Sequence, residues 1–247
     1  KGSFSNVYFV KDNGQDKAVK ITRVDIDDGQ RDHALREYFM YKTAITGLMQ
    51  ATINVTKDKI CFTMPKCGPT WGEYVKSQEY ERLFTYERTE MAYRMLADVS
   101  LQLCQMHSHG LVHNDLHQNN IIYYNGKWWI IDFGWCSNDR ELLPIVQCPW
   151  QPVPENIHNR ECISGYEIDT WSLAFLFSFG YYGKHKVWVN KMKNLETGEE
   201  TYDYSNYYKE LQTFCDYAPP DITNFLVFDP DQRRLCASAK TMYTMAS

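Results

Sequence analysis

The chain has 247 residues, enough for one large domain or for two lobes that share a cleft. Hydrophobic residues make up 44% and charged residues 23%, a balance that excludes a disordered or low-complexity protein. A formal net charge of -5 gives no direct signal for nucleic-acid binding, and no apolar run approaches the roughly 18 residues needed to span a bilayer. We therefore expect a soluble protein with no membrane segment.

The eight cysteines are dispersed, and none forms a C-x-x-C pair. Because a chain of this size needs no disulfides, the pattern favours reduced thiols in an intracellular protein. We expect a cytoplasmic location, with the nucleus as the alternative. Zinc binding by Cys148, His158 and Cys162 is the less favoured interpretation, since their spacing fits no zinc-finger pattern.

The first quarter of the chain alternates short β-rich runs with turn signals. The predicted strands are 4–10, 17–22, 51–55 and 59–64. Asn13–Gly14 lies between the first two runs and predicts a tight hairpin. A helical pattern follows over 35–49, so this part predicts a small β-rich lobe with one main helix.

Two prolines and a glycine between Met64 and Pro69 end that region, because neither regular structure continues through them. Helices dominate afterwards. Residues 89–108 carry apolar side chains at three- and four-residue steps, whereas 169–179 is apolar on nearly all sides and belongs inside a lobe. Short strands at 120–124 and 128–131 are joined by an Asn-Gly turn. The second part therefore predicts a larger, mainly helical lobe.

The residues with the clearest chemistry lie in and after the segment His113–Asn120. Asp115 and Asn120 are five positions apart on an irregular loop and can converge, and Asp132, delivered by the hairpin that follows, can join them. Two carboxylates and an amide oxygen suit Mg²⁺ carrying a phosphate. One carboxylate then remains to orient a hydroxyl group or to accept its proton.

This region resembles the protein kinase superfamily, whose signature is H-R-D-L-x-x-x-N followed by D-F-G. The matching residues are His113, Asp115, Leu116, Asn120, Asp132, Phe133 and Gly134. Further similar motifs are Ala18-Val19-Lys20, Val153-Pro154-Glu155, Asp169-Thr170-Trp171-Ser172 and Asp229-Pro230-Asp231-Gln232-Arg233. The resemblance implies an α+β bilobal kinase fold, with an N-lobe at about 1–64, a hinge at about 65–70 and a C-lobe at about 71–247. It also implies that the first strand begins before Lys1.

The resemblance assigns roles to the matched residues. Asp115 would orient the substrate hydroxyl and take its proton, and Asn120 and Asp132 would bind Mg²⁺. Lys20, positioned by Glu37, would hold the α- and β-phosphates of ATP. The activity implied is phosphoryl transfer to a protein substrate, at Ser/Thr rather than Tyr, by a monomeric catalytic domain.

Other residues would surround the nucleotide. The loop Gly2–Ser5 resembles the glycine-rich loop, although only one of three glycines is visible, and Gly68-Pro69-Thr70-Trp71 resembles the G-P-S-L of casein kinase I-like enzymes. The departures from consensus also suggest a viral Ser/Thr kinase. Nucleotide contacts are therefore expected from Gly2, Ser3, Phe4, Ser5, Val7, Ala18, Met64, Lys66, Cys67 and Ile122. His117, where Ser/Thr kinases carry a lysine, would assist at the γ-phosphate, either as a neutral donor or as a cation.

Two departures from the family pattern keep alternatives open. Asn114 replaces the arginine that usually pairs with a phosphorylated activation segment, which implies activity without that phosphorylation. Cys148 stands where a threonine usually contacts the catalytic Asp. The sparse glycine-rich loop and Cys148 leave a nucleotide-binding pseudokinase scaffold as one alternative. The other is a small-molecule kinase of the aminoglycoside or choline kinase type, because such enzymes share the H-x-D-x-x-x-x-N loop that His113–Asn120 resembles.

Several expectations concern structure alone. The ring of His113 should pack beneath Phe133 rather than bind zinc, and His107 should be an ordinary residue of the helix end. Asp169 lies within an apolar helix and needs partners, which the resemblance supplies as backbone N–H groups of the 113–115 loop. The resemblance also pairs Arg233 with Glu155.

Overall fold

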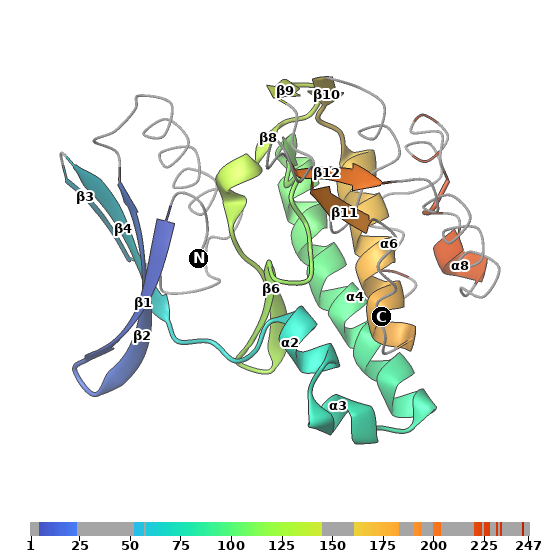
Figure 1. Cartoon of the computed structure of the whole chain (residues 1–247), viewed down its shortest axis with the longest axis horizontal. Coiled ribbons are helices and arrows are strands. Elements are labelled where there is room, and N and C mark those ends of the chain that lie inside the picture. Colours follow the sequence, from blue (N-terminus) through green and yellow to red (C-terminus); the bar gives the residue numbers. More distant parts are fainter. Residues whose placement is uncertain are drawn as a thin grey trace.

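The computed structural model describes residues 5–23, 52–56, 58–144, 161–182, 190–193, 200–203, 220–223 and 225–227, together with Asp231, Arg233 and Thr244. Figure 1 shows a β-sheet on one side and a mainly helical lobe on the other. The predicted bilobal α+β arrangement is confirmed. The helix predicted over 35–49 lies outside the described residues.

The N-lobe sheet has four antiparallel strands in the order β1-β2-β4-β3. Its strands are β1 (Ser5–Asp12), β2 (Gln15–Arg23), β3 (Thr52–Val55) and β4 (Lys59–Pro65). The predicted hairpin is confirmed, because Asn13 and Gly14 adopt φ values of 49° and 82° in the turn between β1 and β2. Positive φ at both central residues matches the twist of the flanking strands, and Asn-Gly adopts it at low cost.

The connection between the lobes is attached to the C-lobe by backbone hydrogen bonds. Gly68 N–H donates to the carbonyl of Tyr123 at 2.8 Å, and Tyr123 N–H donates to the carbonyl of Pro69 at 3.0 Å. A Cβ on Gly68 would lie 3.0 Å from that same Tyr123 oxygen, so only glycine allows this approach without a shift. The connection therefore behaves as a short extra strand beside β6 (Ile121–Tyr124).

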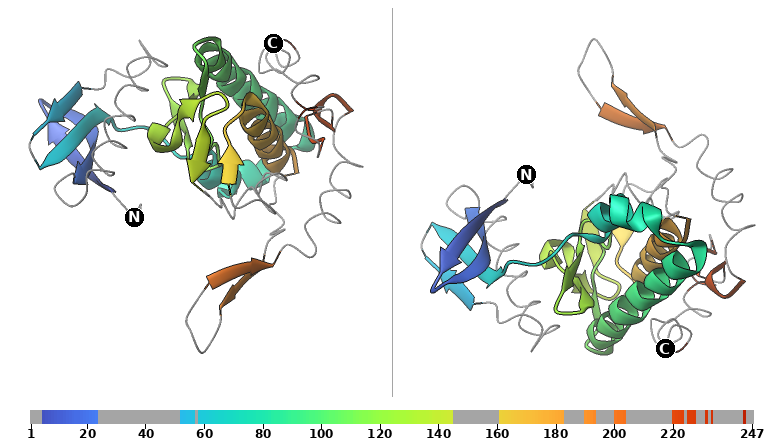
Figure 2. Two further views of the ribbon diagram at one scale, coloured as in Figure 1. Left: turned by 90° about the horizontal axis from the view of Figure 1, so that it is seen from above. Right: turned by 90° about the horizontal axis from the view of Figure 1, so that it is seen from below.

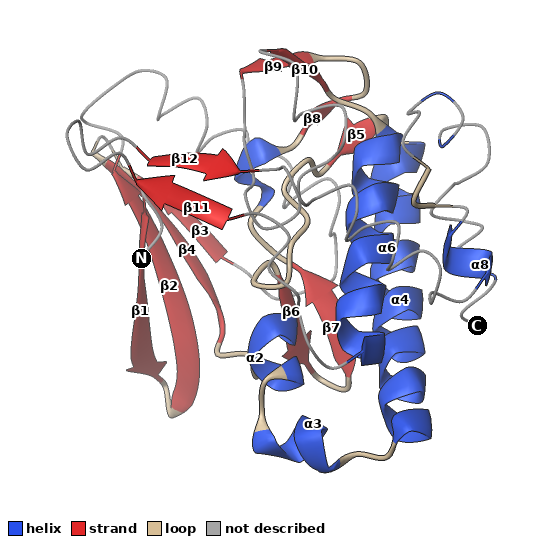
Figure 3. Cartoon of the chain, turned by 45° about the vertical axis from the view of Figure 1, so that its right-hand side comes forward, coloured by secondary structure: helices blue, strands red, loops and turns tan. Residues whose placement is uncertain are grey.

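Two long helices form the centre of the C-lobe and lie side by side in Figures 1 and 3. They are α4 (Thr85–Ser108) and α6 (Tyr166–Tyr182). The first begins four residues before the predicted start, because the Glu87 carboxylate accepts a 2.8 Å hydrogen bond from Phe84 N–H and caps the helix there. The second is buried along nearly its whole length, as its apolar composition predicts.

Smaller elements complete the lobe. They are α2 (Trp71–Val75), α3 (Gln78–Arg82), β5 (Leu111–Val112), β7 (Lys127–Ile130), η1 (Phe133–Trp135), β8 (Ser137–Asn138), β9 (Leu142–Pro144), β10 (Glu161–Ile163), β11 (Asn190–Lys193), β12 (Glu200–Asp203) and α8 (Pro220–Thr223). The predicted β6–β7 hairpin is confirmed. The β11–β12 hairpin projects away from the helices in Figure 2. Among the described helices, none is long and apolar enough to cross a membrane.

An aromatic cluster attaches the start of the C-lobe to its core. Trp71 is fully buried, donates its indole N–H to the Leu176 carbonyl at 3.1 Å, and meets Trp128 edge-on with ring centroids 4.8 Å apart. Gly180 faces the Trp71 ring so closely that a Cβ there would collide with it. The burial of two indoles contributes several kcal/mol to the stability of the region that follows the connection.

Candidate active site

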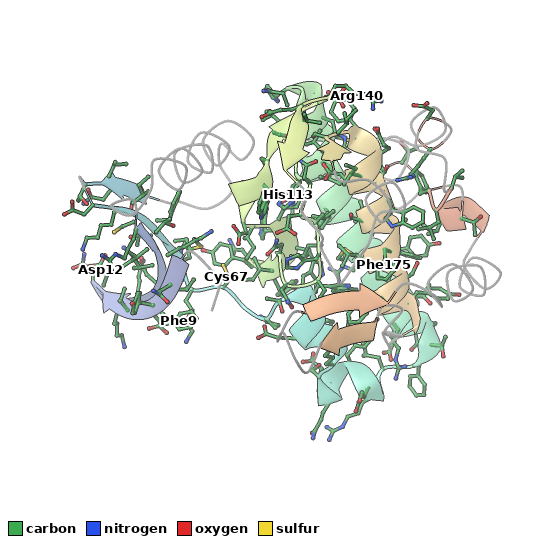
Figure 4. All side chains as sticks on the ribbon, turned by 45° about the horizontal axis from the view of Figure 1, so that its top comes forward. Phe9, Asp12, Cys67, His113, Arg140 and Phe175 are labelled. Carbon is green, nitrogen blue, oxygen red and sulfur yellow. The ribbon has the colours of Figure 1, made fainter. Side chains whose placement is uncertain are left out.

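A cavity of about 630 Å³ lies between the N-lobe sheet and the C-lobe, a volume suited to a small-molecule ligand. It is lined by Asn6, Val7, Tyr8, Phe9, Ala18, Lys20, Met64, Pro65, Cys67, Gly68, Thr70, Glu73, Ile122, Ile131 and Asp132. In Figure 4, Cys67 lies on the connection between the lobes, and His113 lies in the C-lobe. The cavity therefore combines residues of both lobes and of the connection.

The lining includes many of the residues expected around the nucleotide. They are Val7, Ala18, Lys20, Met64, Cys67, Ile122 and Asp132. The sequence did not single out Thr70 or Glu73, which border the cavity at the start of α2 and cap that helix reciprocally. The spacing T-x-x-E was the available signal, since it is the capping-box pattern. Gly2, Ser3, Phe4 and Glu37 lie outside the described residues, and Ser5 begins β1.

Lys66 is not among the residues that line the cavity, although its neighbours Pro65 and Cys67 are. Its backbone N–H donates to the Asp16 carbonyl at 3.0 Å, and its ammonium lies 5.6 Å from the centroid of the ring of Phe9, which borders the cavity. The expected contact between Lys66 and the nucleotide stays a prediction.

Lys20 and Asp132 meet in the cavity although 112 positions separate them. The Lys20 ammonium donates to the Asp132 carboxylate at 2.8 Å. Asp132 has φ 64° and ψ 73°, a left-handed conformation that costs of the order of 1 kcal/mol for a non-glycine residue. Burial raises the pKa of Asp132, but the charge attraction and the hydrogen bond of Lys20 outweigh it, so the pKa falls below its ordinary value. Asp132 is therefore ionised at neutral pH.

Asp115 and Asn120 converge as the five-residue spacing predicts. The Asn120 amide donates to the Asp115 carbonyl at 2.9 Å and to the Asp115 carboxylate at 3.2 Å. Burial, reinforced by repulsion from Asp132, raises the pKa of Asp115 to about 7. A carboxyl group with this pKa can accept a proton near neutral pH, as a general base must.

His117 lies beside Asp115. Its Nδ1 accepts a 3.1 Å hydrogen bond from Asn119 N–H, so the ring proton is on Nε2, which is 3.7 Å from the Asp115 carboxylate. Burial and the neighbouring His113 lower the pKa of His117 to about 4. Of the two states that the sequence left open, the structure favours the neutral imidazole.

The ring of His113 links the loop of residues 113–120 to the segment that carries Asp132. It is fully buried and meets the Phe133 ring edge-on, with centroids 5.3 Å apart. Its Nδ1 accepts from Asp115 N–H at 3.2 Å, and its Nε2 lies 3.3 Å from the Ile131 carbonyl. Burial lowers the pKa of His113, so the ring stays neutral and joins the residues on either side of the site. The predicted packing of His113 against Phe133 is confirmed.

The buried carboxylate of Asp169 has the partners expected for it. It accepts hydrogen bonds from the backbone N–H groups of His113 at 2.8 Å and Asn114 at 3.0 Å. The prediction for His107 is wrong, because its Nε2 lies 2.9 Å from the same carboxylate and its ring lies against Tyr166. His107 therefore belongs to the support of the catalytic loop. Sequence gave no signal for this contact, which joins residues 62 positions apart.

Asn114 is the centre of a neutral hydrogen-bond network. Its amide donates to the Trp135 carbonyl at 3.0 Å and to the Ser137 hydroxyl at 2.9 Å. Its side-chain oxygen accepts from the Ser164 hydroxyl at 3.0 Å, and the two serine hydroxyls are 2.7 Å apart. The loop of residues 113–120 is thus joined to Ser137 and Ser164 by groups that carry no charge.

Other motif residues are placed only in part. Arg233 is fully buried, with its guanidinium 4.8 Å from the centroid of the Trp171 ring and its Nη1 donating to the Glu167 carbonyl at 3.1 Å. Its expected partner Glu155 lies outside the described residues, as do Cys148, Val153-Pro154 and Asp229-Pro230. Within the described part of the chain, no group of three or more His, Cys, Asp or Glu side chains is arranged to hold a metal ion.

A two-lobed fold with a lysine–aspartate pair and an Asp/Asn loop at its cleft defines a kinase-type domain. The Protein kinase domain family matches residues 1–242, and the chain belongs to that family.

Several curated proteins are similar to the chain. Calcium/calmodulin-dependent protein kinase type 1 of Caenorhabditis briggsae is 29% identical over 146 residues, which cover 54% of this chain and 39% of that protein. Calcium-dependent protein kinase 5 of Plasmodium berghei is 27% identical over 234 residues, which cover 85% of this chain and 38% of that protein. A probable serine/threonine-protein kinase of Dictyostelium discoideum is 36% identical over 75 residues, 29% of this chain and 8% of that protein. The chain thus spans well under half the length of these relatives.

Proposed function

We propose that this domain catalyses ATP- and Mg²⁺-dependent phosphoryl transfer to hydroxyl groups of a protein substrate, at serine or threonine. The observation that carries the proposal is that Lys20 and Asp132 pair in the wall of the cavity, while Asp115, bonded to Asn120, lies near enough to Asp132 for the two carboxylates to repel each other. The names of the similar proteins support transfer to protein, and one of them names serine and threonine.

Nucleotide would occupy the cavity. Val7 and Ala18 from the sheet and Ile122 from the C-lobe line it with apolar surface, which suits the flat faces of a base. Lys20 reaches the same space with a positive charge that can pair with phosphate oxygens. The Coulomb attraction of Asp132 keeps the ammonium directed into the cavity until phosphate arrives.

Asn120 and Asp132 would hold Mg²⁺. Their fit to this ion rests on the donor set: a carboxylate that stays ionised, and an amide whose NH₂ group is turned to Asp115, which leaves Oδ1 as the coordinating atom. Magnesium bound there would neutralise charge on the phosphate oxygens during transfer. Two protein ligands suffice, since Mg²⁺ in phosphate sites also takes substrate oxygens and water.

Asp115 would orient the hydroxyl of the substrate and receive its proton. The pKa near 7 gives it a large ionised fraction at neutral pH together with useful basicity. His117 has its Nε2 3.7 Å from this carboxylate and is neutral. It would donate a hydrogen bond to the γ-phosphate beside Asp115 without adding charge.

The test is transfer of labelled γ-phosphate from Mg-ATP to a panel of casein, histone and acidic peptides, with the modified residue identified by mass spectrometry. Asp115→Asn and Lys20→Met are expected to abolish transfer. Lys17→Met is the matched control, because Lys17 is on the same strand but pairs with Asp12 on the hairpin. Transfer that persists in Asp115→Asn or Lys20→Met would refute the assigned roles.

Two other outcomes would replace the proposal. A protein that is stabilised by ATP but transfers no phosphate would be a nucleotide-binding scaffold. Transfer to aminoglycosides or choline, with none to protein, would make it a small-molecule kinase.

A further inference from the structure

The β6–β7 hairpin leads to Asp132 in the cleft. The outward backbone groups on its two edges have different hydrogen-bond partners. On the β6 edge, backbone groups of Tyr123 pair with the connection at Gly68 and Pro69. On the β7 edge, Trp128 and Ile130 direct backbone groups toward α4, since antiparallel pairing leaves every second residue facing outward. A strand edge buried against a helix needs hydrogen-bond partners.

Side chains of α4 supply those partners. Gln102 donates from its amide to the Trp128 carbonyl at 2.8 Å and accepts from Ile130 N–H at 2.9 Å. Asp98, one turn earlier, accepts from Trp128 N–H at 2.9 Å. Together they replace the backbone of a third strand along the outer edge of β7.

Gln102 is suited to this position for a physical reason. It is 6% exposed, lies among the apolar residues of α4, and its amide also donates to the Asp98 carbonyl at 2.9 Å. The side chain thus satisfies its own buried amide while holding two consecutive outward groups of β7. A neutral amide can donate and accept at adjacent positions of a strand, as a peptide group does.

The hydrogen bonds continue from Gln102 to the site. Beyond Ile130, the N–H of Ile131 donates to the Asn120 carbonyl at 2.9 Å, and the Ile131 carbonyl is 3.3 Å from His113 Nε2. Asp132 follows in its left-handed conformation. Successive backbone groups on the approach to Asp132 are therefore fixed, and Gln102 holds two of them.

We propose that Gln102 is a positioning residue for phosphoryl transfer: by holding β7 in register against α4, it sets the location of the Asp132 carboxylate relative to Asn120. This inference rests on the proposed function, because it assigns Gln102 a role toward the Mg²⁺-phosphate site. Partners that orient a metal ligand typically change metal affinity about 10–100-fold when removed.

The test compares Gln102→Met, which keeps the shape of the side chain but loses its hydrogen bonds, with wild type. We expect the Mg²⁺ concentration for half-maximal transfer to rise about tenfold and kcat to fall about tenfold, whereas KM for ATP changes less than threefold. Gln102→Leu also loses these hydrogen bonds and should behave as Gln102→Met does. Ser100→Ala is the matched control, because Ser100 is buried in the same helix and its hydroxyl, among the described residues, donates to the Ala97 carbonyl of its own helix rather than to β7.

Two measurements do not depend on turnover. Calorimetry at a Mg²⁺ concentration below saturation should show weaker ATP binding by Gln102→Met, whereas binding in the absence of Mg²⁺ should be unchanged. Hydrogen exchange in 127–131 should accelerate at least tenfold in this variant, whereas the Tyr123 amide, held by Pro69, stays protected.

The outcomes separate the two proposals. If wild type transfers no phosphate, the proposed function fails, while calorimetry and exchange still decide the role of Gln102. An unchanged Mg²⁺ requirement in Gln102→Met, or an equal rise in Ser100→Ala, would overturn the inference. If Gln102→Met does not fold, Gln102→Leu decides the question by the same criteria.

Discussion

Replacing Asp115 by asparagine should abolish phosphoryl transfer and, at the same time, stabilise the fold at alkaline pH. The Asp115 carboxyl has a pKa of about 7 in the folded protein and an ordinary value of 3.8. Between these values the folded state binds a proton that the unfolded state does not, so lowering the pH stabilises wild type through this group. Above pH 7, the buried carboxylate costs stability that asparagine does not.

The difference of about three pH units corresponds to about 4 kcal/mol at pH 8 and about 2 kcal/mol at pH 5.5. These are upper values, since asparagine must also be hydrogen-bonded; its side-chain oxygen can accept from Asn120 as the carboxylate does. For a chain of this size, 4 kcal/mol raises Tm by of the order of 10 °C.

The assay is thermal unfolding of wild type and Asp115→Asn at pH 8 and pH 5.5. A chelator keeps divalent cations away from the site, so that only the protein's own groups set the pKa. The variant should melt higher at both values, with the gap at pH 5.5 about half of that at pH 8. Asp58→Asn, at an exposed position of the N-lobe, should change Tm little at either pH. The reasoning would be refuted if Asp115→Asn melted below wild type at pH 8 or if the gap did not depend on pH.

The site makes three further predictions. In the transfer assay, kcat/KM should rise about tenfold per pH unit up to pH 7 and then level off, because Asp115 acts as the ionised form; a flat profile from pH 5.5 to 8 would exclude it as the base. Asn114→Leu, measured by urea unfolding, should lose about 2–4 kcal/mol, since the four side-chain hydrogen bonds of Asn114 disappear and leucine is strained at its φ of 63°. The same uncharged network predicts that phosphatase treatment of wild type leaves the transfer rate unchanged. Lys66→Ala should leave the Kd for ATP within about twofold by calorimetry, because the Lys66 side chain is not part of the cavity lining; a tenfold loss would assign that side chain to the nucleotide site.

Local sequence signals were sufficient for much of the fold. The Asn-Gly pairs at 13–14 and 125–126 predicted two hairpins, because these residues adopt positive φ at low cost. The apolar spacing of 89–108 predicted α4, but not its start, since the capping contact from Glu87 involves residues before the apolar stripe begins. Periodicity reports burial and is silent about helix ends that lie in solvent.

The chemistry of the loop from His113 to Asn120 could also be predicted, because Asp115 and Asn120 are five positions apart on one irregular loop and their side chains can meet. The backbone hydrogen bond from Lys66 to Asp16 could not be predicted, because it joins two segments that are separate in the sequence.

The sequence by itself determined the local segments, their helix or strand type and the functional residues that each carries, since backbone preference and apolar periodicity act over a few neighbouring positions. Only the tertiary structure decided the partners: His107 with Asp169, Asn114 with two serines, and Gln102 with β7. Burial also decided the charge states, making Asp115 a base near neutrality and His117 a neutral ring. The partners and the charge states both depend on groups that are far apart in the sequence. Desolvation by such groups cannot be predicted from the local sequence.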